Sequence, residues 1–220
     1  ITDTEPGVYT IELFLGSLPY HATLTKTGEA DAPVLPETMY IIGEAVGGWD
    51  WEANGQDMTP VHSKDGAFWA IRYLEAGQGF KFCQDKAWGR DFTNLGSDDS
   101  GYTVDGGNCY VAESGLYMIA IDCAAEKVIV EPAKVWGFGP CFNGWEGDPS
   151  AFTVDGAKVV SPALQAGSLR MYATASCYDV AWWQMEFNVF DGKIAYRGAG
   201  GEQAEVDCTA GQMKSDAVQA

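Results

Sequence analysis

Apolar and polar residues alternate along short stretches of this chain, and turn residues separate the stretches. Tyr117, Ile119 and Ile121 recur at every second position, which puts their side chains on one face of a β-strand. Gly, Asp and Asn lie between such stretches, and long runs with helical spacing are absent. The pattern predicts an all-β protein built from antiparallel sandwiches, with strands at 40–42, 67–74, 79–83, 108–111, 116–122 and 127–131.

The second half of the chain repeats the pattern of the first. MYIIGEAVGGW at 39–49 matches VWGFGPCFNGW at 135–145, at an offset of 96 residues. LEAGQGFKFC then matches LQAGSLRMYA, and AWGRDF matches AWWQMEF, in the same order. Ordered matches of this kind predict two tandem β-sandwich modules, at about residues 36–132 and 133–220. The matches pair Trp49 with Trp145, Lys81 with Arg170, and Trp88 with Trp182.

Residues 1–35 are predicted to be the last strands of a preceding module, followed by a linker. PGVYTIEL at 6–13 resembles SGLYMIAI at 114–121, and a second strand is expected at Leu18–Thr25. The stretch ADAPVLP at 30–36 has two prolines and no periodicity, which is typical of a linker. The first five residues, ITDTE, lack the basic start and the apolar stretch of a signal peptide.

The net charge of the chain limits the kinds of partner that it is expected to bind. The chain has 13 Lys and Arg against 31 Asp and Glu, which gives a formal net charge of −18. Nucleic acids and anionic lipids are both recognised by basic surfaces, so we expect neither as a partner. No apolar run approaches the ~20 residues of a membrane-spanning helix. Aromatic residues make up 13% of the chain, which favours neutral ligands such as sugars.

The chain offers little for metal or cofactor chemistry, and we expect neither. His21 and His62 are the only histidines, and both are expected to be solvated loop or strand residues. The six cysteines form no CxxC pair and are expected to be small apolar core residues. A disulfide between Cys109 and Cys123 across a hairpin stays open. The cysteines are Cys83, Cys109, Cys123, Cys141, Cys177 and Cys208.

Indole rings gather in loops of the first module. Trp49 and Trp51 flank Asp50 after a Gly-Gly turn, and Trp88 lies in the loop after the strand at 79–83. A sugar ring stacks its apolar C–H face on an aromatic ring, while its hydroxyls take hydrogen bonds at the rim. Two indoles from neighbouring loops can form an angled platform for a curved glycan. The alternative for Trp49 is that it packs into the core.

Polar donors accompany these indoles. Lys81 alternates with two phenylalanines and so points away from their face, either as a donor to sugar hydroxyls or as an ordinary solvated lysine. Arg90 and Asn108 are further candidate partners of the hydroxyls. The second module repeats the set less completely, because Glu202 stands where the first module has Asn108. Its candidates are Trp145, Arg170, Trp182 and Trp183.

Enzymatic functions have weaker support. The many acidic residues could supply the paired carboxylates of a glycosidase, but none stands in a recognisable motif. No nucleophile elbow, phosphate loop or dinucleotide fingerprint is present. The Asp-rich stretch at 96–108 lacks the ligand spacing of an EF-hand and indicates a solvated turn. We therefore expect binding without catalysis.

The motifs MYIIGEAVGGWDW, FKF, AWGRDF and SGLYMIAIDCAAEKVIV, together with FNVFDGKIAYRGAGGE, resemble the tandem modules of the SusE/SusF-type outer-membrane lipoproteins of Bacteroidetes. The resemblance covers nearly the whole chain from about Pro6. It implies immunoglobulin-like β-sandwich modules that bind starch without catalysis or cofactor, tethered by lipid to the outer cell surface. It also implies sites made of two aromatic residues, a basic residue and other polar groups.

Carried over by position, that role falls on Trp49, Lys81, Trp88, Arg90 and Asn108 in the first module, and on Trp145, Arg170 and Trp182 in the second. Trp51 and Trp183 are alternates. Polysaccharide is the expected partner, with other proteins of a glycan-uptake complex as additional partners. A spacer or docking module of such a complex, with no sugar site, is the alternative function, and a divergent glycosidase is the third.

Overall fold

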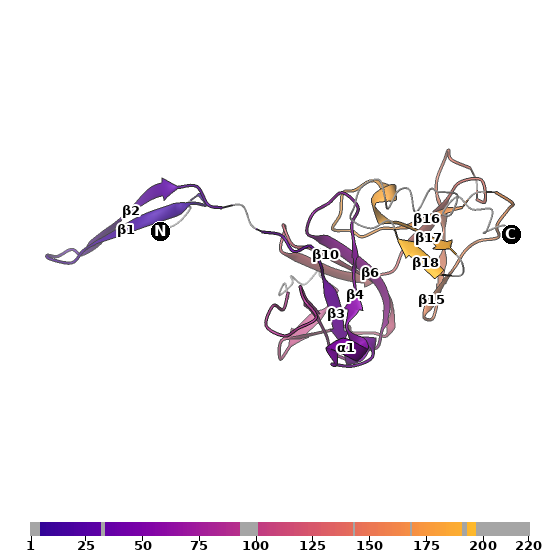
Figure 1. Ribbon diagram of the computed structural model, residues 1–220, viewed down its shortest axis with the longest axis horizontal. Coiled ribbons are helices and arrows are strands. Elements are labelled where there is room, and N and C mark those ends of the chain that lie inside the picture. The colour runs from indigo at the N-terminus through magenta and orange to yellow at the C-terminus, as the bar shows by residue number, and fades with distance from the viewer. Residues whose placement is uncertain are drawn as a thin grey trace. The chain divides into compact units, whose positions relative to one another are not determined.

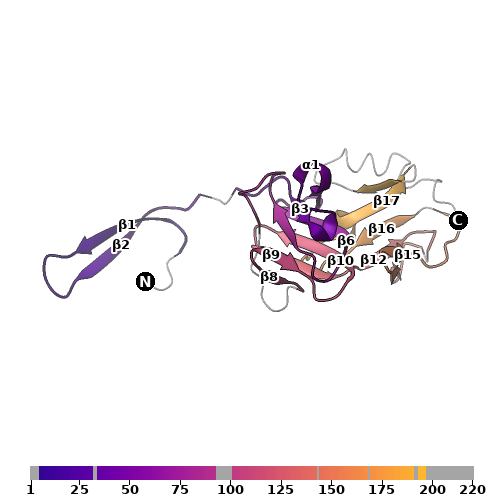
Figure 2. The same cartoon turned by 90° about the horizontal axis from the view of Figure 1, so that it is seen from below.

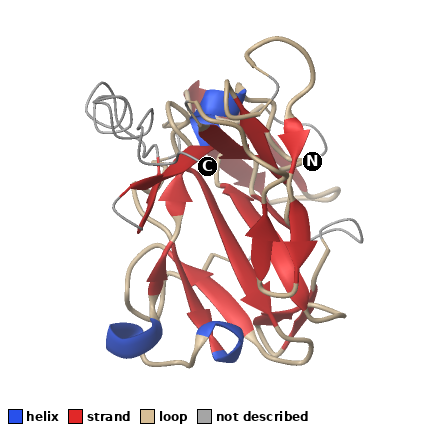
Figure 3. Ribbon diagram, turned by 90° about the vertical axis from the view of Figure 1, so that its right-hand side faces the viewer, coloured by secondary structure: helices blue, strands red, loops and turns tan. Residues whose placement is uncertain are grey.

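The computed structural model of the 220-residue chain describes residues 5–31, 34–92, 101–142, 144–167, 169–190 and 193–196. Its contacts divide the chain into two compact units, Ile1–Val34 and Leu35–Ala220, and each is described by itself. Strands make up nearly all of the regular structure (Figure 1, Figure 3). The all-β class predicted from the alternation is therefore confirmed. Within the described ranges no helix has the length and apolarity needed to cross a membrane.

In the larger unit, two antiparallel sheets face each other within residues 36–132, which we call the first module. The strands are β3 (Tyr40–Gly43), β4 (Gln56–Asp57), β5 (Thr59–Pro60), β6 (Ala67–Leu74), β7 (Phe80–Cys83), β8 (Thr103–Asp105), β9 (Asn108–Tyr110), β10 (Gly115–Asp122) and β11 (Lys127–Pro132). The sheet orders are β4-β3-β7-β9-β8 and β11-β10-β6-β5. Most of the predicted strands agree with these bounds to within a residue or two.

The core of the first module lies between its two sheets. Ile41 and Phe82, from the first sheet, are fully buried against Phe68 and Ile121, from the second. Along each strand, such residues recur at every second position. One face of the strand is therefore apolar, and this face packs against the opposite sheet. Burying large apolar side chains of this kind contributes roughly 1.5–3 kcal/mol each.

Residues 133–220, which we call the second module, contribute one larger sheet and a hairpin to the described structure. The strands are β12 (Val135–Phe138), β13 (Ser150–Ala151), β14 (Thr153–Asp155), β15 (Lys158–Val160), β16 (Arg170–Ala173), β17 (Glu186–Phe190) and β18 (Lys193–Tyr196). The sheet order is β13-β12-β16-β17-β18, and β14 and β15 form a separate two-stranded sheet. The boundaries of the modules stay a prediction.

The sheet β11-β10-β6-β5 is buried on both of its faces. Trp69 and Met118 alternate with the residues of the first core and join a second cluster with Val135, Met171 and Phe187 of the second module. The ring centroids of Trp69 and Phe187 are 6.1 Å apart. Strands β6 and β10 lie beside β16 and β17 in Figure 2. The inner face of the second module's sheet is thus covered by the first module.

A hydrogen-bonded tyrosine reinforces this contact between modules. The hydroxyl of Tyr178 lies 2.8 Å from the carbonyl oxygen of Phe68 and 2.5 Å from that of Ile121, which are on β6 and β10. Desolvation by burial raises the pKa of Tyr178, so the hydroxyl keeps its proton and acts as a donor. The side-chain amide of Gln184 donates to the carbonyl oxygen of His62 at 2.7 Å.

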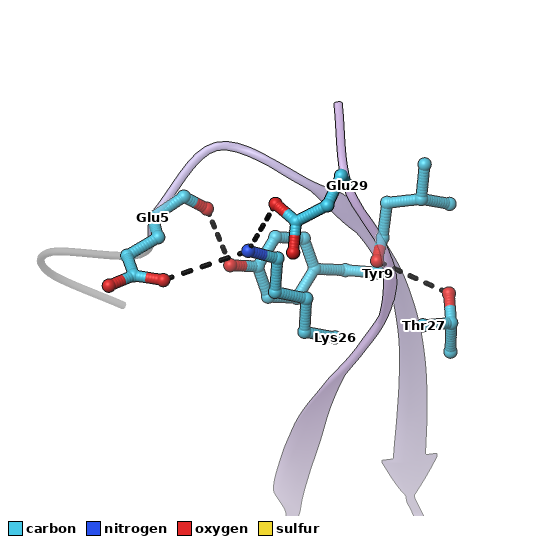
Figure 4. A network of polar contacts seen from close by, with 6 residues as sticks. Glu5, Tyr9, Lys26, Thr27 and Glu29 are labelled. Carbon is cyan, nitrogen blue, oxygen red and sulfur yellow. Dashed lines mark hydrogen bonds and ion pairs between the residues drawn. The ribbon is translucent and has the colours of Figure 1, made fainter. Parts of the chain in front are cut away.

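The N-terminal unit contains an antiparallel hairpin of β1 (Val8–Phe14) and β2 (His21–Gly28), with an irregularity in register between Val8 and Tyr9. The expected strand at Leu18–Thr25 begins later, because Pro19 has no N–H to donate to a ladder and lies in the turn. The ammonium of Lys26 lies 3.6 Å from the carboxylate of Glu5 and 2.9 Å from that of Glu29; Figure 4 shows how these side chains lie. These pairs are solvent-exposed and contribute little stability.

The histidine expectation is half wrong. His21 is exposed and stacks on Phe14 with centroids 4.5 Å apart. His62, expected to be solvated, is only 5% exposed, because the second module covers it and Trp183 packs edge-on against its ring at 5.3 Å.

The cysteine expectation is largely right. Four cysteines are buried, Cys177 is half-buried, and all five of the described cysteines carry free thiols. The Cys109–Cys123 disulfide is therefore not formed, and Cys208 lies outside the described residues. Desolvation by burial raises the pKa of the Cys109 thiol to about 12, so it stays protonated at neutral pH.

Candidate functional site

A tight turn and a single helical turn present the first two indoles. Strand β3 ends at Gly43, whose backbone hydrogen-bonds in both directions with Gly48. Gly43 has a φ of 143°, and a Cβ there would lie 2.2 Å from the carbonyl oxygen of Gly79, so only glycine fits. The carboxylate of Asp50 then accepts hydrogen bonds from the backbone N–H groups of Glu52 and Ala53 and caps the short helix α1 (Trp51–Asn54).

Trp88 stands on the loop that follows β7. The backbone N–H of Gln84 donates to the carbonyl oxygen of Arg90 at 3.3 Å and closes the base of the loop. The guanidinium of Arg90 then donates to the Asp85 carboxylate at 2.8 Å and to the Gln84 side chain at 2.6 Å. Trp88 is 53% exposed, so the loop holds its indole at the surface.

The three indoles form one cluster. The ring centroids of Trp49 and Trp88 are 6.2 Å apart with an angle of 39° between the planes, and those of Trp51 and Trp88 are 5.1 Å apart at 57°. The indole N–H of Trp51 is buried and has no hydrogen-bond partner among the residues that the structure describes. Trp51 packs against Trp88, and the faces of Trp49 and Trp88 are tilted relative to each other.

An open pocket of about 170 Å³ lies beside these faces. It is lined by Trp49, Lys81, Trp88 and Asn108, and we call these residues the first-module pocket. They come from four separate positions along the chain: the turn after β3, strand β7, the loop after β7, and strand β9. Two indole faces, an ammonium and an amide thus converge on one shallow surface.

The cation of this pocket is held by a neighbouring acid. The ammonium of Lys81 donates to Oδ2 of Asp91 at 2.9 Å, and the Cys83 thiol donates to Oδ1 at 3.2 Å. Partial burial opposes ionisation of Asp91, but the hydrogen bonds from Lys81 and Cys83 outweigh it, so the pKa of Asp91 lies below its ordinary value. Burial and the bond to Asp91 raise the pKa of the Cys83 thiol to about 12.

Of the six residues that the sequence predicts for the first module, four line the pocket and two do not. Trp51 lies against Trp88 without lining it, and Arg90 pairs within its own loop. Asp91 was missed altogether. A signal for it was present, because in the match of AWGRDF with AWWQMEF the final acid and phenylalanine of each motif correspond.

The second module carries a different aromatic cluster at the corresponding strands. Phe138 packs on Trp145 with centroids 5.7 Å apart and on Trp182 at 5.8 Å. Tyr172 packs on Trp182 at 5.7 Å. Trp145 is 47% exposed, so this cluster also reaches the surface. Phe138 and Tyr172 were not among the predicted candidates. We call Phe138, Trp145, Tyr172 and Trp182 the second-module cluster.

Arg170 was predicted to donate to sugar hydroxyls, but the structure places it in a buried ion pair. It is only 9% exposed, and its guanidinium pairs through Nε and Nη2 with both carboxylate oxygens of Glu186, which is fully buried. The guanidinium also lies 5.4 Å from the centroid of Trp182. Trp183 packs on His62 rather than on this cluster. Glu202, the counterpart of Asn108, lies outside the described residues.

These surfaces combine aromatic rings with polar groups and are suited to holding a ligand. Among the residues that the structure describes, no group of three or more His, Cys, Asp or Glu side chains is arranged to hold a metal ion. Tilted indole faces with donors at their rim are the features of a carbohydrate-binding module on a β-sandwich scaffold.

The comparisons with known proteins identify the family. The sequence profile of the SusF/SusE starch-specific carbohydrate-binding modules matches this chain twice, at residues 38–129 and 134–217. The chain therefore belongs to the SusF/SusE family, and the expectation of a protein that is not an enzyme is confirmed.

Two matches to individual proteins agree with this assignment. The outer membrane protein SusF of Bacteroides thetaiotaomicron is 32% identical over 200 residues, covering 80% of this chain and 41% of SusF. The crystal structure of SusF from the same organism matches with a TM-score of 0.68 and 29% identity, covering 82% of this chain and 44% of that one. This chain thus spans about two-fifths of the length of SusF.

Proposed function

We propose that this chain binds starch or a related α-glucan without transforming it, and that the first-module pocket is the principal site. The observation that carries the proposal is the convergence of Trp49, Lys81, Trp88 and Asn108 on one open pocket. Membership of a family of starch-specific modules supports the choice of ligand.

The proposed mechanism combines stacking with hydrogen bonding. Glucose units lay their C–H faces on Trp49 and Trp88, whose planes differ by 39°, so two successive units of a curved chain each meet an aromatic face. The ammonium of Lys81 and the amide of Asn108 bond to hydroxyls at the rim. A shallow site of this kind gives micromolar to millimolar affinity, roughly 4–8 kcal/mol of binding free energy.

The second-module cluster is proposed as a second and weaker site. Trp145 and Trp182 supply aromatic surface, but the cation that would join them is engaged by Glu186. Two sites on one chain raise the overall affinity for a long glycan through effective concentration. The name of the relative, outer membrane protein SusF, supports a location at the outer cell surface, which the sequence resemblance extends to a lipid tether.

Native affinity electrophoresis tests the proposal. The wild-type chain and the variants Trp88→Ala and Trp49→Ala migrate through gels that contain soluble starch, and in parallel through gels with other glycans. We expect starch to retard the wild type. Each substitution should lower the apparent affinity for starch by about tenfold or more, because it removes a stacking surface. Tyr20→Ala, which removes an exposed aromatic ring from the N-terminal hairpin, is the matched control and should leave retardation unchanged.

The outcomes separate the candidate functions. Retardation by another glycan, with the same dependence on Trp88, keeps the mechanism and changes the ligand. No retardation in any gel overturns the proposal and favours the spacer or docking function in a glycan-uptake complex. Because Trp88 is half exposed, its removal should leave the midpoint of thermal unfolding nearly unchanged.

A further inference from the structure

A pairing of one cation with one acid recurs in the two modules. Lys81 pairs with Asp91, and Arg170 pairs with Glu186. The two cations are equivalent by strand register, because Lys81 lies opposite Ile42 on β3 and Arg170 lies opposite Phe138 on β12. Since Ile42 and Phe138 are themselves 96 residues apart, the repeat places the two cations at the same point of the fold.

The two acids are equivalent as well. Asp91 forms an isolated antiparallel bridge with Cys83, two residues beyond Lys81 on the same strand. Glu186 pairs with Tyr172, two residues beyond Arg170. Residues two apart on a strand share a face, so each acid sits beside the cation on the side where the cation projects. The recurrence of the register makes the pairing a feature of the fold and not an accident of one loop.

In the first module this acid leaves the cation available to a ligand. A lysine ammonium has three donors, of which one is used by Asp91. The Cys83 thiol holds the other carboxylate oxygen, so the acid itself is fixed. Asp91 is not among the residues that line the pocket, whereas Lys81 is. The acid therefore touches the ligand-binding surface only through Lys81.

We propose that Asp91 is a positioning residue, which holds the Lys81 ammonium at the first-module pocket so that its remaining donors meet the glycan. This inference rests on the proposed function of that pocket. A free lysine samples many rotamers, and ordering it on binding costs about 0.5–1.5 kcal/mol, so an ammonium already held in place binds roughly threefold to tenfold more tightly.

A double-mutant cycle tests the positioning role. Binding of soluble starch is measured for the wild type, Asp91→Asn, Lys81→Met and the double variant, by affinity electrophoresis. We expect Asp91→Asn alone to weaken binding about threefold to tenfold, and to have no further effect once Lys81 is Met. Asp155→Asn, which breaks an exposed pair with Lys158 on the hairpin β14–β15, is the matched control and should bind as the wild type does.

Other outcomes overturn the inference. An equal loss from Asp91→Asn with and without Lys81 means that the acid acts on the fold or on the ligand directly. Tighter binding by Asp91→Asn means that the acid competes with the ligand for the ammonium. Asp91→Glu keeps the charge if the Asn variant fails to fold, and its effect must also vanish in the Lys81→Met background.

The same measurements keep this inference apart from the proposed function. If starch does not retard the wild type, or Trp88→Ala leaves retardation unchanged, the proposed function itself fails. If the wild type binds through Trp88 and the cycle gives equal losses in both backgrounds, only the positioning role of Asp91 fails.

Discussion

The two modules place a cation at the same point of their strands and use it in different ways. The side chains of Lys81 and Asp91 are 20% and 31% exposed, and the ammonium lines an open pocket. Those of Arg170 and Glu186 are 11% and 0% exposed, and the guanidinium is bound to both carboxylate oxygens. The Lys81–Asp91 pair therefore lies at the surface, and the Arg170–Glu186 pair lies in the interior.

The difference follows from the chemistry of the two cations. Arginine presents a planar fork that matches a carboxylate with two parallel hydrogen bonds, which satisfies both groups when they are buried. Lysine is a compact charge whose unused donors stay directed to solvent or ligand. Position in the repeat thus predicts which residues meet. Their burial determines whether they can contact a ligand or only stabilise the fold.

The largest expected effect is a loss of folding stability when the buried pair is broken. Glu186→Gln leaves the Arg170 charge buried without its partner, so we expect the free energy of unfolding to fall by about 3–5 kcal/mol. Asp91→Asn acts on a partly exposed pair and should cost about 1 kcal/mol or less. Urea unfolding followed by tryptophan fluorescence measures both changes. Equal losses in the two variants contradict the contrast between interior and surface pairs.

A smaller effect is expected in binding. Trp145→Ala removes the exposed indole of the second-module cluster, and we expect it to weaken starch retardation by less than about threefold, because Arg170, the cation beside that cluster, is engaged by Glu186. Trp88→Ala should weaken retardation much more. The comparison fails if Trp145→Ala has as large an effect as Trp88→Ala, since the second module would then contribute as much to binding as the first.

The smallest expected effect is the dependence of the first pair on pH. The pKa of Asp91 is lowered in the folded chain, so its pair with Lys81 stabilises the fold at pH values above the ordinary carboxyl pKa of about 3.9 and is lost as the pH falls below it. The difference in thermal midpoint between the wild type and Asp91→Asn should be present at pH 6 and shrink as the pH falls below the ordinary carboxyl pKa. A difference that does not shrink with acidification shows that the charge of Asp91 is not its cause.

The alternation and the repeat predicted much of the fold and of the first-module pocket. Strands β6 and β10 lie where period-2 spacing puts them, and Trp49, Lys81, Trp88 and Asn108 meet because the ends of neighbouring strands bring them together. Local pattern suffices for such residues, because each follows a turn or occupies the outward face of a strand.

Two of the residues that sequence reasoning misplaced, Arg170 and His62, take their environment from another part of the chain. Arg170 resembles Lys81 in sequence, but its burial depends on Glu186, which β17 brings alongside β16. His62 is buried because Trp183 and Gln184 of the second module cover it. Arg90 stands beside Trp88 in sequence, yet its exposed guanidinium bonds within the loop. Nothing in their immediate neighbours in the sequence marks these contacts.

The sheet that is buried on both faces has a consequence for how this protein can change over generations. Along β10, Ile119 and Ile121 belong to one core and Met118 and Ala120 to the other. Such a strand has no neutral side, so a substitution at any of these positions must be accommodated by one module or the other. The two modules therefore cannot change independently of each other along this strand, as separately folded domains can.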